Sequence, residues 1–202
     1  MDSFLRTELH DSTFILHLGS PDGFPRLTRA VLGELLQQLD AAARSAAVRA
    51  LVLAGTPAAF ATGADLEEVS ALTPVEALRF SALGQRVMRS LDQSAKPVIA
   101  AVRGYCLGGG FDLALACHLR IAADDAKFGH PGGALGIITG WGGTARLPRI
   151  VGRARASEIL SSGRMIGAEE AHALRLVNHV VTPDDTIPAS LSFASRFPPS
   201  AG

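Results

Sequence analysis

This chain of 202 residues has few aromatic residues, two cysteines, no net charge and no long hydrophobic run. Lys and Arg together number 19, as do Asp and Glu, so no excess of positive charge favours a nucleic acid or a membrane surface as a partner. Cys106 and Cys117 are too few for a disulfide framework and lie in apolar sequence typical of buried thiols. No apolar stretch approaches the roughly 20 residues that cross a bilayer, and the first residues lack the features of a secretory signal. These absences predict a cytoplasmic protein.

Aliphatic and small residues must build the core, because aromatic residues make up 5% of a chain that is 48% hydrophobic. The length suits one globular domain. Apolar segments predict strands at residues 4–9, 13–18, 48–53, 98–102, 119–122 and 177–181. Helical periodicity predicts helices at residues 28–43, 74–91, 143–151, 154–161 and 168–174. The repeated order of apolar strand, glycine turn and helix favours an α/β architecture.

Two glycine-bearing turns, at residues 62–65 and 104–110, each lead into a helix. Free N–H groups at a helix start favour negative charge, and two that converge on one carbonyl oxygen would stabilise an enolate or a tetrahedral oxyanion. The spacing alone is equally compatible with two tight strand-to-helix connections. Gly110 stands where a phosphate-binding loop needs lysine, neither a dinucleotide-binding glycine pattern nor a nucleophilic-serine motif is present, and the scattered histidines predict no metal site.

Four ordered motifs closely resemble those of the enoyl-CoA hydratase/isomerase (crotonase) family. They are AFATGADL at residues 59–66, KPVIAAVRGYCLGGG at residues 96–110, AKFG at residues 126–129 and GWGGTARLP at residues 140–148. The resemblance covers most of residues 13–181 and implies a spiral of ββα units, with the C-terminal helical region largely missing. It implies an acyl-CoA-binding core at residues 1–183 and a short remnant of the C-terminal helices at residues 184–202. It also implies an acyl-CoA substrate, no further cofactor, and a homotrimer or hexamer.

By motif position, the resemblance places the two amides of an oxyanion hole on Ala64 and Gly109. Other residues expected to bind the CoA or acyl group are Arg26, Ala61, Thr62, Gly63, Asp65, Leu66, Gly132 and Trp141. Arg26 could reach a CoA phosphate or be a solvated loop residue. Trp141 could edge the acyl pocket or serve only in packing.

The chain departs from the family at both catalytic glutamates. Asp112 stands at the first position and Gly132 at the second. The shorter side chain displaces the carboxylate by roughly 1 Å, which can cost about 10²-fold in rate. Asp112 could therefore act as general base on a differently placed proton, or only favour the helix start through its charge. His130 is the second candidate acid or base, with a structural role as the alternative.

Three functions stay open at this point. The first is an enoyl-CoA hydratase/isomerase-like enzyme that stabilises a thioester enolate. The second is a CoA thioester hydrolase or decarboxylase on the same scaffold, since loss of CO2 from a malonyl-type thioester needs enolate stabilisation and no strong base. The third is a non-catalytic subunit that binds acyl-CoA or is purely structural.

Overall fold

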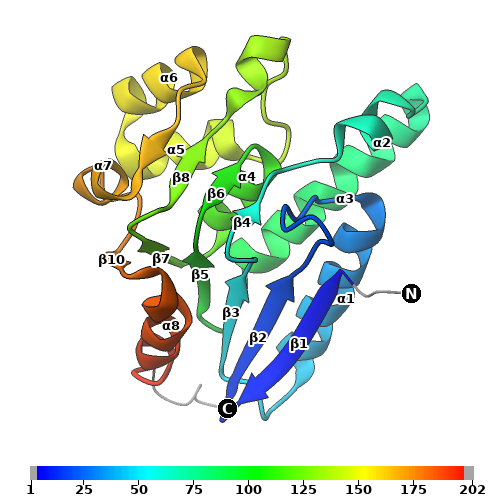
Figure 1. Cartoon of the computed structure of the whole chain (residues 1–202). Coiled ribbons are helices and arrows are strands. Elements are labelled where there is room, and N and C mark those ends of the chain that lie inside the picture. Colours follow the sequence, from blue (N-terminus) through cyan, green and yellow to red (C-terminus); the bar gives the residue numbers. More distant parts are fainter. Residues whose placement is uncertain (1–3, 198–202) are drawn as a thin grey trace.

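Two β-sheets organise the computed structural model, which describes residues 4–197 (Figure 1). The larger sheet has the order β1-β2-β3-β5-β7-β10 and consists of β1 (Leu5–His10), β2 (Thr13–Leu18), β3 (Ala50–Ala54), β5 (Val98–Val102), β7 (Leu119–Ala123) and β10 (His179–Val181). The smaller sheet has the order β4-β6-β8-β9 and consists of β4 (Ala59–Ala61), β6 (Tyr105–Leu107), β8 (Lys127–Gly129) and β9 (Ile166–Gly167). Neighbouring strands are parallel except for the pairs β1/β2 and β8/β9.

Helices follow the strands in a repeated order. They are α1 (Arg29–Arg44), α2 (Leu66–Ser70), α3 (Pro74–Asp92), α4 (Gly109–Ala116), α5 (Gly143–Val151), α6 (Arg153–Ser162), α7 (Ala168–Ala173) and α8 (Thr186–Ala194), with 3₁₀ turns η1 (Pro131–Leu135) and η2 (Pro183–Asp185). Strand β3 leads to β4 and α2, and β5 leads to β6 and α4. The chain thus repeats the ββα unit that the family resemblance implies. Among residues 4–197, no helix is both long and apolar enough to cross a membrane.

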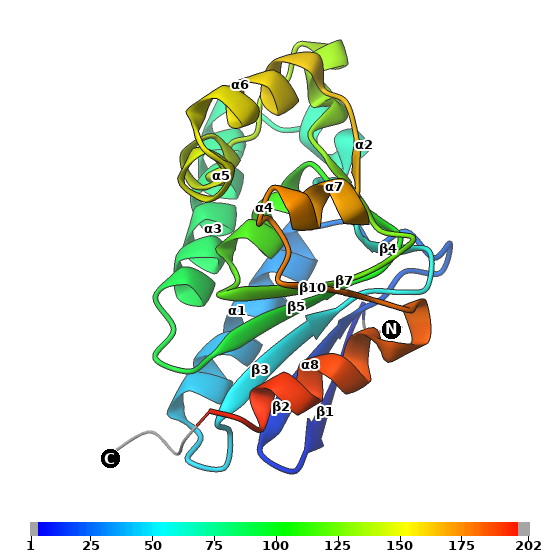
Figure 2. The same cartoon turned by 90° about the vertical axis from the view of Figure 1, so that its left-hand side faces the viewer.

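Both faces of the central strands β3 and β5 are covered, which explains why these two strands are apolar throughout. Leu51 and Leu53 of β3 belong to the cluster that contains the apolar faces of α1 and α3. Val52, one residue on, belongs to the cluster formed with α8 on the opposite face. Figure 2 shows α8 on the side of the sheet away from α1, where it packs on β3, β5 and β7.

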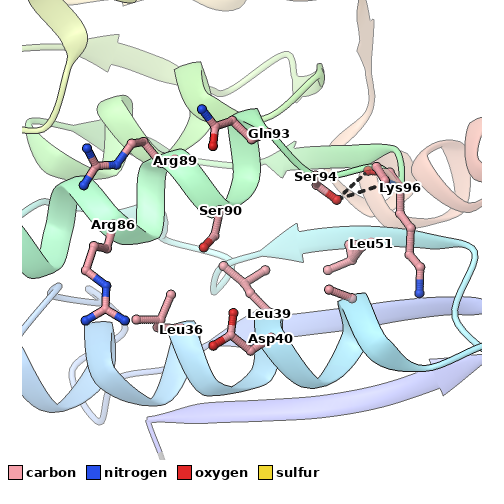
Figure 3. Close-up of a pocket in the computed structure, with 12 residues that line it drawn as sticks. Leu36, Leu39, Asp40, Leu51, Arg86, Arg89, Ser90, Gln93, Ser94 and Lys96 are labelled. Carbon is pink, nitrogen blue, oxygen red and sulfur yellow. Dashed lines mark hydrogen bonds between the residues drawn. The ribbon is translucent and has the colours of Figure 1, made fainter.

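Side chains fix both ends of α1. Thr28 caps α1 by accepting a hydrogen bond from the N–H of Val31. The ammonium of Lys96 donates to the carbonyl oxygens of Ala42 and Ser45, at 2.6 and 2.7 Å, where a cation stabilises the carboxyl end of α1. A hollow of about 370 Å³ lies between α1 and α3, and Lys96 is among the residues that line it (Figure 3).

The whole smaller sheet is absent from the elements predicted from the sequence. Its strands have two or three residues each, too few for an alternating pattern to show. The sequence analysis also expects a loop at residues 131–141, where the structure has η1. Helix α8 lies within residues 184–202, where the family resemblance implies a remnant of the C-terminal helices. The other predicted helices and strands are present, with ends that shift by up to two residues. Residues 198–202 of the expected C-terminal remnant lie outside the described residues.

The substitution Gly110→Ala tests the packing of α4 against β4. A Cβ at Gly110 would lie 2.2 Å from the carbonyl oxygen of Ala61, so the backbones would have to separate. We expect Gly110→Ala to lower the free energy of unfolding by about 1–3 kcal/mol, measured by urea denaturation. The matched control is Gly33→Ala in α1, where a Cβ meets no atom within 4 Å. The better helix propensity of alanine should raise the free energy of unfolding of this variant by at most ~1 kcal/mol. Equal stability of the two variants would contradict this packing.

Candidate active site

A cavity of about 380 Å³ opens at the start of α4, between α2, the first half of α3 and the loop that follows β8. Its lining is mostly apolar and includes Leu66, Val69, Leu72, Phe80, Ile137, Ile138 and Trp141. Among the residues expected to form the site, those that line it are Thr62, Gly63, Ala64, Leu66, Gly109, Asp112, His130, Gly132 and Trp141. A mostly apolar cavity with a few polar groups is typical of a small-molecule site.

The two glycine turns meet at this cavity because β4 and β6 are parallel neighbours. A Cβ at Gly63 would lie 2.9 Å from the amide nitrogen of Gly109, so the two turns are in direct contact. Gly63 has φ +98° and Gly108 has φ +53°, in the left-handed region that favours glycine. The sequence therefore needs glycine here for both the backbone conformation and the close approach.

Some N–H groups of the two turns donate to backbone acceptors, and others have no acceptor within residues 4–197. Thr62 donates its N–H to the carbonyl oxygen of Pro25 at 2.9 Å, and Gly108 donates to that of Gly129 at 2.9 Å. Within residues 4–197, neither Ala64 nor Gly109 donates its N–H to a backbone or side-chain acceptor. Gly109 is the first residue of α4, where unpaired N–H groups carry the positive end of the helix dipole.

Asp112, in the first turn of α4, is the one carboxylate in the lining of the cavity. Its side chain is fully buried, and burial raises the pKa of the carboxyl to about 6. Oδ2 accepts hydrogen bonds from the hydroxyl of Thr139 and from the N–H of Trp141, the latter at 3.2 Å. Both hydrogen bonds oppose the rise in pKa. Oδ1 has no hydrogen-bond partner within residues 4–197.

His130 faces the free oxygen of Asp112. The pairing of Leu107 with Gly129 in β6 and β8 places His130 beside α4, and its Nε2 lies 3.5 Å from Oδ1. The ring stacks on Phe111 with 4.9 Å between centroids. Burial lowers the pKa of His130 to about 4, so the imidazole is neutral at pH 7.

Three buried polar atoms at this point lack partners within residues 4–197: Oδ1 of Asp112 and both ring nitrogens of His130. Buried polar groups are normally hydrogen-bonded, because an unpaired one costs about 1–3 kcal/mol. Such a cluster beside a cavity is suited to a water molecule or a polar substrate atom. A Cβ at Gly143 would lie 2.2 Å from Oδ1, so glycine at the start of α5 leaves room for this arrangement.

Three expected site residues do not line the cavity. Ala61 is fully buried in β4. Asp65 caps α2 by accepting from the N–H groups of Glu67 and Glu68, at 2.9 and 3.1 Å. Arg26 pairs with Asp22 at 2.8 Å and lies 4.0 Å from Asp65. Among residues 4–197 there is no group of three His, Cys, Asp or Glu residues that could hold a metal ion.

Sequence reasoning missed two features of the site. One is Thr139 as the hydrogen-bond donor to Asp112. The other is Gly84 of α3, where a Cβ would lie 2.3 Å from the indole of Trp141. The sequence does carry a signal for Gly84, because an isolated glycine in the middle of a predicted helix lowers helix stability and is usually retained where a neighbour packs closely.

Comparison with known proteins settles the family. A family model described as Enoyl-CoA hydratase/isomerase matches residues 11–198. The chain belongs to the enoyl-CoA hydratase/isomerase family. This membership makes it an acyl-CoA enzyme of the lyase/isomerase type and confirms the resemblance seen in the sequence motifs.

Relatives cover nearly all of this chain. A protein of Syntrophomonas wolfei named crotonyl-CoA hydratase is 40% identical over 190 residues, which are 94% of this chain and 73% of that protein. A short-chain-enoyl-CoA hydratase of Clostridium acetobutylicum is 37% identical over 177 residues, 85% of this chain and 68% of that protein. The crystal structure of an enoyl-CoA hydratase from Bacillus anthracis matches with a TM-score of 0.92 and 34% identity, over 96% of this chain and 76% of that one. The structure of Pseudomonas aeruginosa DspI matches with a TM-score of 0.94 and 30% identity, over 98% of this chain and 83% of that one. The crotonase-like α/β fold is thereby confirmed.

Burial of Asp112 in this family member has a cost that depends on pH. Its pKa of about 6 in the folded protein exceeds the ~3.9 of an unfolded aspartate, so stability is lost as pH rises between these values. We expect Asp112→Asn to unfold with a free energy on the order of 2 kcal/mol higher than the native protein at pH 7.5, and with little difference at pH 4.

Urea denaturation from pH 4 to pH 8 measures this difference. Asp40→Asn, at an exposed position of α1, controls for the loss of one negative charge. A stability difference between Asp112→Asn and the native protein that stays the same at every pH would contradict the pKa of the buried carboxyl.

Proposed function

We propose that this enzyme holds the thioester oxygen of an enoyl-CoA between the amides of Ala64 and Gly109 and stabilises the enolate that forms there. The observation that carries the proposal is the contact of the two glycine turns, which brings two N–H groups without intramolecular acceptors to the cavity that holds Asp112. Removing one donor of this kind typically slows a reaction by about 10²–10³-fold. The relatives named as crotonyl-CoA and short-chain-enoyl-CoA hydratases support an enoyl-CoA substrate.

Asp112 is the proposed general base. With a pKa of about 6 its carboxyl is ionised at pH 7 and yet close enough to that pH to exchange a proton efficiently. In hydration, Oδ1 accepts a proton from water as the water oxygen bonds to carbon 3, and the electron pair moves to the thioester oxygen. The same carboxyl then returns the proton to carbon 2, which completes the addition of water.

His130 is the proposed partner for the water. Gly132 supplies no second carboxylate, and neutral His130 faces Oδ1 with both nitrogens unpaired. Its ring can therefore hold the water beside Asp112 by one hydrogen bond. Proton transfer by Asp112 and enolate stabilisation by two amides complete the reaction, so we propose no cofactor beyond the CoA thioester.

The CoA moiety is proposed to lie along the turn at residues 61–66. Thr62, Gly63 and Leu66 line the cavity on that side, and Arg26 lies 4.0 Å from Asp65, which belongs to the turn.

We also propose, by family resemblance, that the chain assembles into a homotrimer or hexamer. Light scattering would measure this oligomeric state. We further propose a cytoplasmic location.

Gly132 also favours a second candidate, the decarboxylation of a malonyl-type acyl-CoA. Carbon dioxide leaves with cleavage of the bond to carbon 2, and the electron pair forms the same enolate without a base. Evolution of CO2 from malonyl-CoA, with no hydration of crotonyl-CoA, would favour this candidate. Release of free CoA thiol would indicate thioester hydrolysis.

Deuterium exchange at carbon 2 of butyryl-CoA in D2O tests the general base. We expect the native enzyme to exchange, with a rate that rises with pH through an apparent pKa of about 6 as Asp112 ionises. Asp112→Asn should slow exchange by about 10²–10⁴-fold, and the Asp40→Asn control should leave it unchanged. Exchange at the native rate in Asp112→Asn would remove Asp112 from the mechanism. Binding of butyryl-CoA without exchange would instead favour decarboxylation or a non-catalytic subunit.

His130→Phe separates the two proposed roles, because it keeps the ring stacked on Phe111 and removes both nitrogens. Hydration of crotonyl-CoA should slow by about 10²-fold, whereas exchange at carbon 2 of butyryl-CoA, which adds no water, should slow much less. Mass spectrometry and loss of the enoyl absorbance measure the two rates. An equal loss of both reactions would show that His130 acts only by positioning Asp112.

A further inference from the structure

We propose that the indole of Trp141 limits the length of the acyl chain that the cavity accepts, so that this enzyme selects short acyl-CoA thioesters. The inference rests on the proposed function, because it takes the cavity to be the acyl site. It goes further by assigning selectivity to one side chain and to the two glycines that make room for it.

The indole fills the gap between α3 and α4. A Cβ at Gly84 of α3 would lie 2.3 Å from Nε1 and Cε2 of Trp141, and one at Gly109 of α4 would lie 2.4 Å from Cζ3. The ring therefore touches one backbone with its five-membered part and the other with its six-membered part. Only 7% of Trp141 is exposed, and what is left of its surface lines the cavity.

This wall is held in place from several sides. Phe80 packs edge-on against the indole with 5.3 Å between ring centroids. The N–H of Trp141 donates to Asp112 at 3.2 Å, and its carbonyl oxygen accepts from Arg146 at 3.1 Å. Arg146 also reaches Asp92 at the end of α3, at 3.3 Å. The backbone at Trp141 is thus tied to α3 and α4, and the indole could turn aside for a longer ligand only by losing its packing on Phe80, Gly84 and Gly109.

The position of the wall relates it to the reacting atoms. The ring lies against Gly109, whose amide is proposed to bind the thioester oxygen. The backbone N–H of Trp141 donates a hydrogen bond to Asp112, the proposed base. We take an acyl chain that extends beyond carbons 2 and 3 to pass the Trp141 and Phe80 rings, which both line the cavity. Because the flanking positions are glycines, a smaller residue at 141 would leave an apolar gap continuous with the cavity, and such gaps bind apolar ligands.

Binding of saturated acyl-CoAs measures this selectivity without requiring turnover. Isothermal titration with acetyl-, butyryl-, octanoyl- and decanoyl-CoA would be compared for the native enzyme and Trp141→Ala. We expect the native enzyme to bind decanoyl-CoA at least about 10-fold more weakly than butyryl-CoA, and Trp141→Ala to remove or reverse that ratio, as several buried methylene groups can readily supply a 10-fold change in affinity.

Gly84→Ala gives a change in the opposite direction and does not remove core volume. Its methyl group would displace the indole toward the cavity, so butyryl-CoA should bind about 10-fold more weakly while acetyl-CoA is little affected. Leu78→Ala, on the same helix at a side chain that is 73% exposed, is the control and should keep the native profile. If Trp141→Ala fails to fold, Gly84→Ala still decides the question.

The outcomes separate the two proposals. Equal affinity of the native enzyme for all four thioesters, or an unchanged ratio in both variants, would overturn the role of Trp141. Failure of the native enzyme to bind any acyl-CoA would overturn the proposed function, and this inference with it. The expected binding profile without exchange at carbon 2 would support the role of Trp141 and contradict the enolate chemistry alone.

Discussion

The contact between two glycine turns is the constraint on which the rest of the site depends. Gly63 and Gly109 can touch because neither carries a side chain, and Gly110 lies against the backbone of β4 for the same reason. This approach brings the start of α4 to the end of β4 and leaves the amides of Ala64 and Gly109 without internal acceptors. The position of Asp112, one turn into α4, then follows from the position of Gly109.

The same arrangement carries costs in stability that a purely structural design would avoid. A buried carboxyl with one unpaired oxygen and a buried neutral histidine with two unpaired nitrogens are unfavourable without a ligand or a water molecule. These three atoms are half of the six buried side-chain atoms without hydrogen-bond partners among residues 4–197, and their concentration beside one cavity is characteristic of a functional site. Because residues 132 and 143 are glycines, no side chain from either position fills the space beside these unpaired atoms.

The larger sheet and the long helices could be predicted from the sequence because their patterns are local. β5 is five apolar residues covered on both faces, and α3 begins with Pro74 after the capping residue Thr73. The smaller sheet could not be predicted, since its strands of two or three residues exist only through pairing with distant partners. That pairing also creates the contact of Asp112 with His130, which explains why family motifs identified both residues but not their geometry.

Infrared spectroscopy of the bound ligand would show whether two backbone amides polarise a thioester carbonyl. Butyryl-CoA labelled with a heavy isotope at the thioester carbon would be compared free in water and bound to the enzyme. Hydrogen bonds from Ala64 and Gly109 weaken the C=O bond, so we expect a bound carbonyl stretch at lower wavenumber than in water. A bound stretch at the same or a higher wavenumber would contradict it.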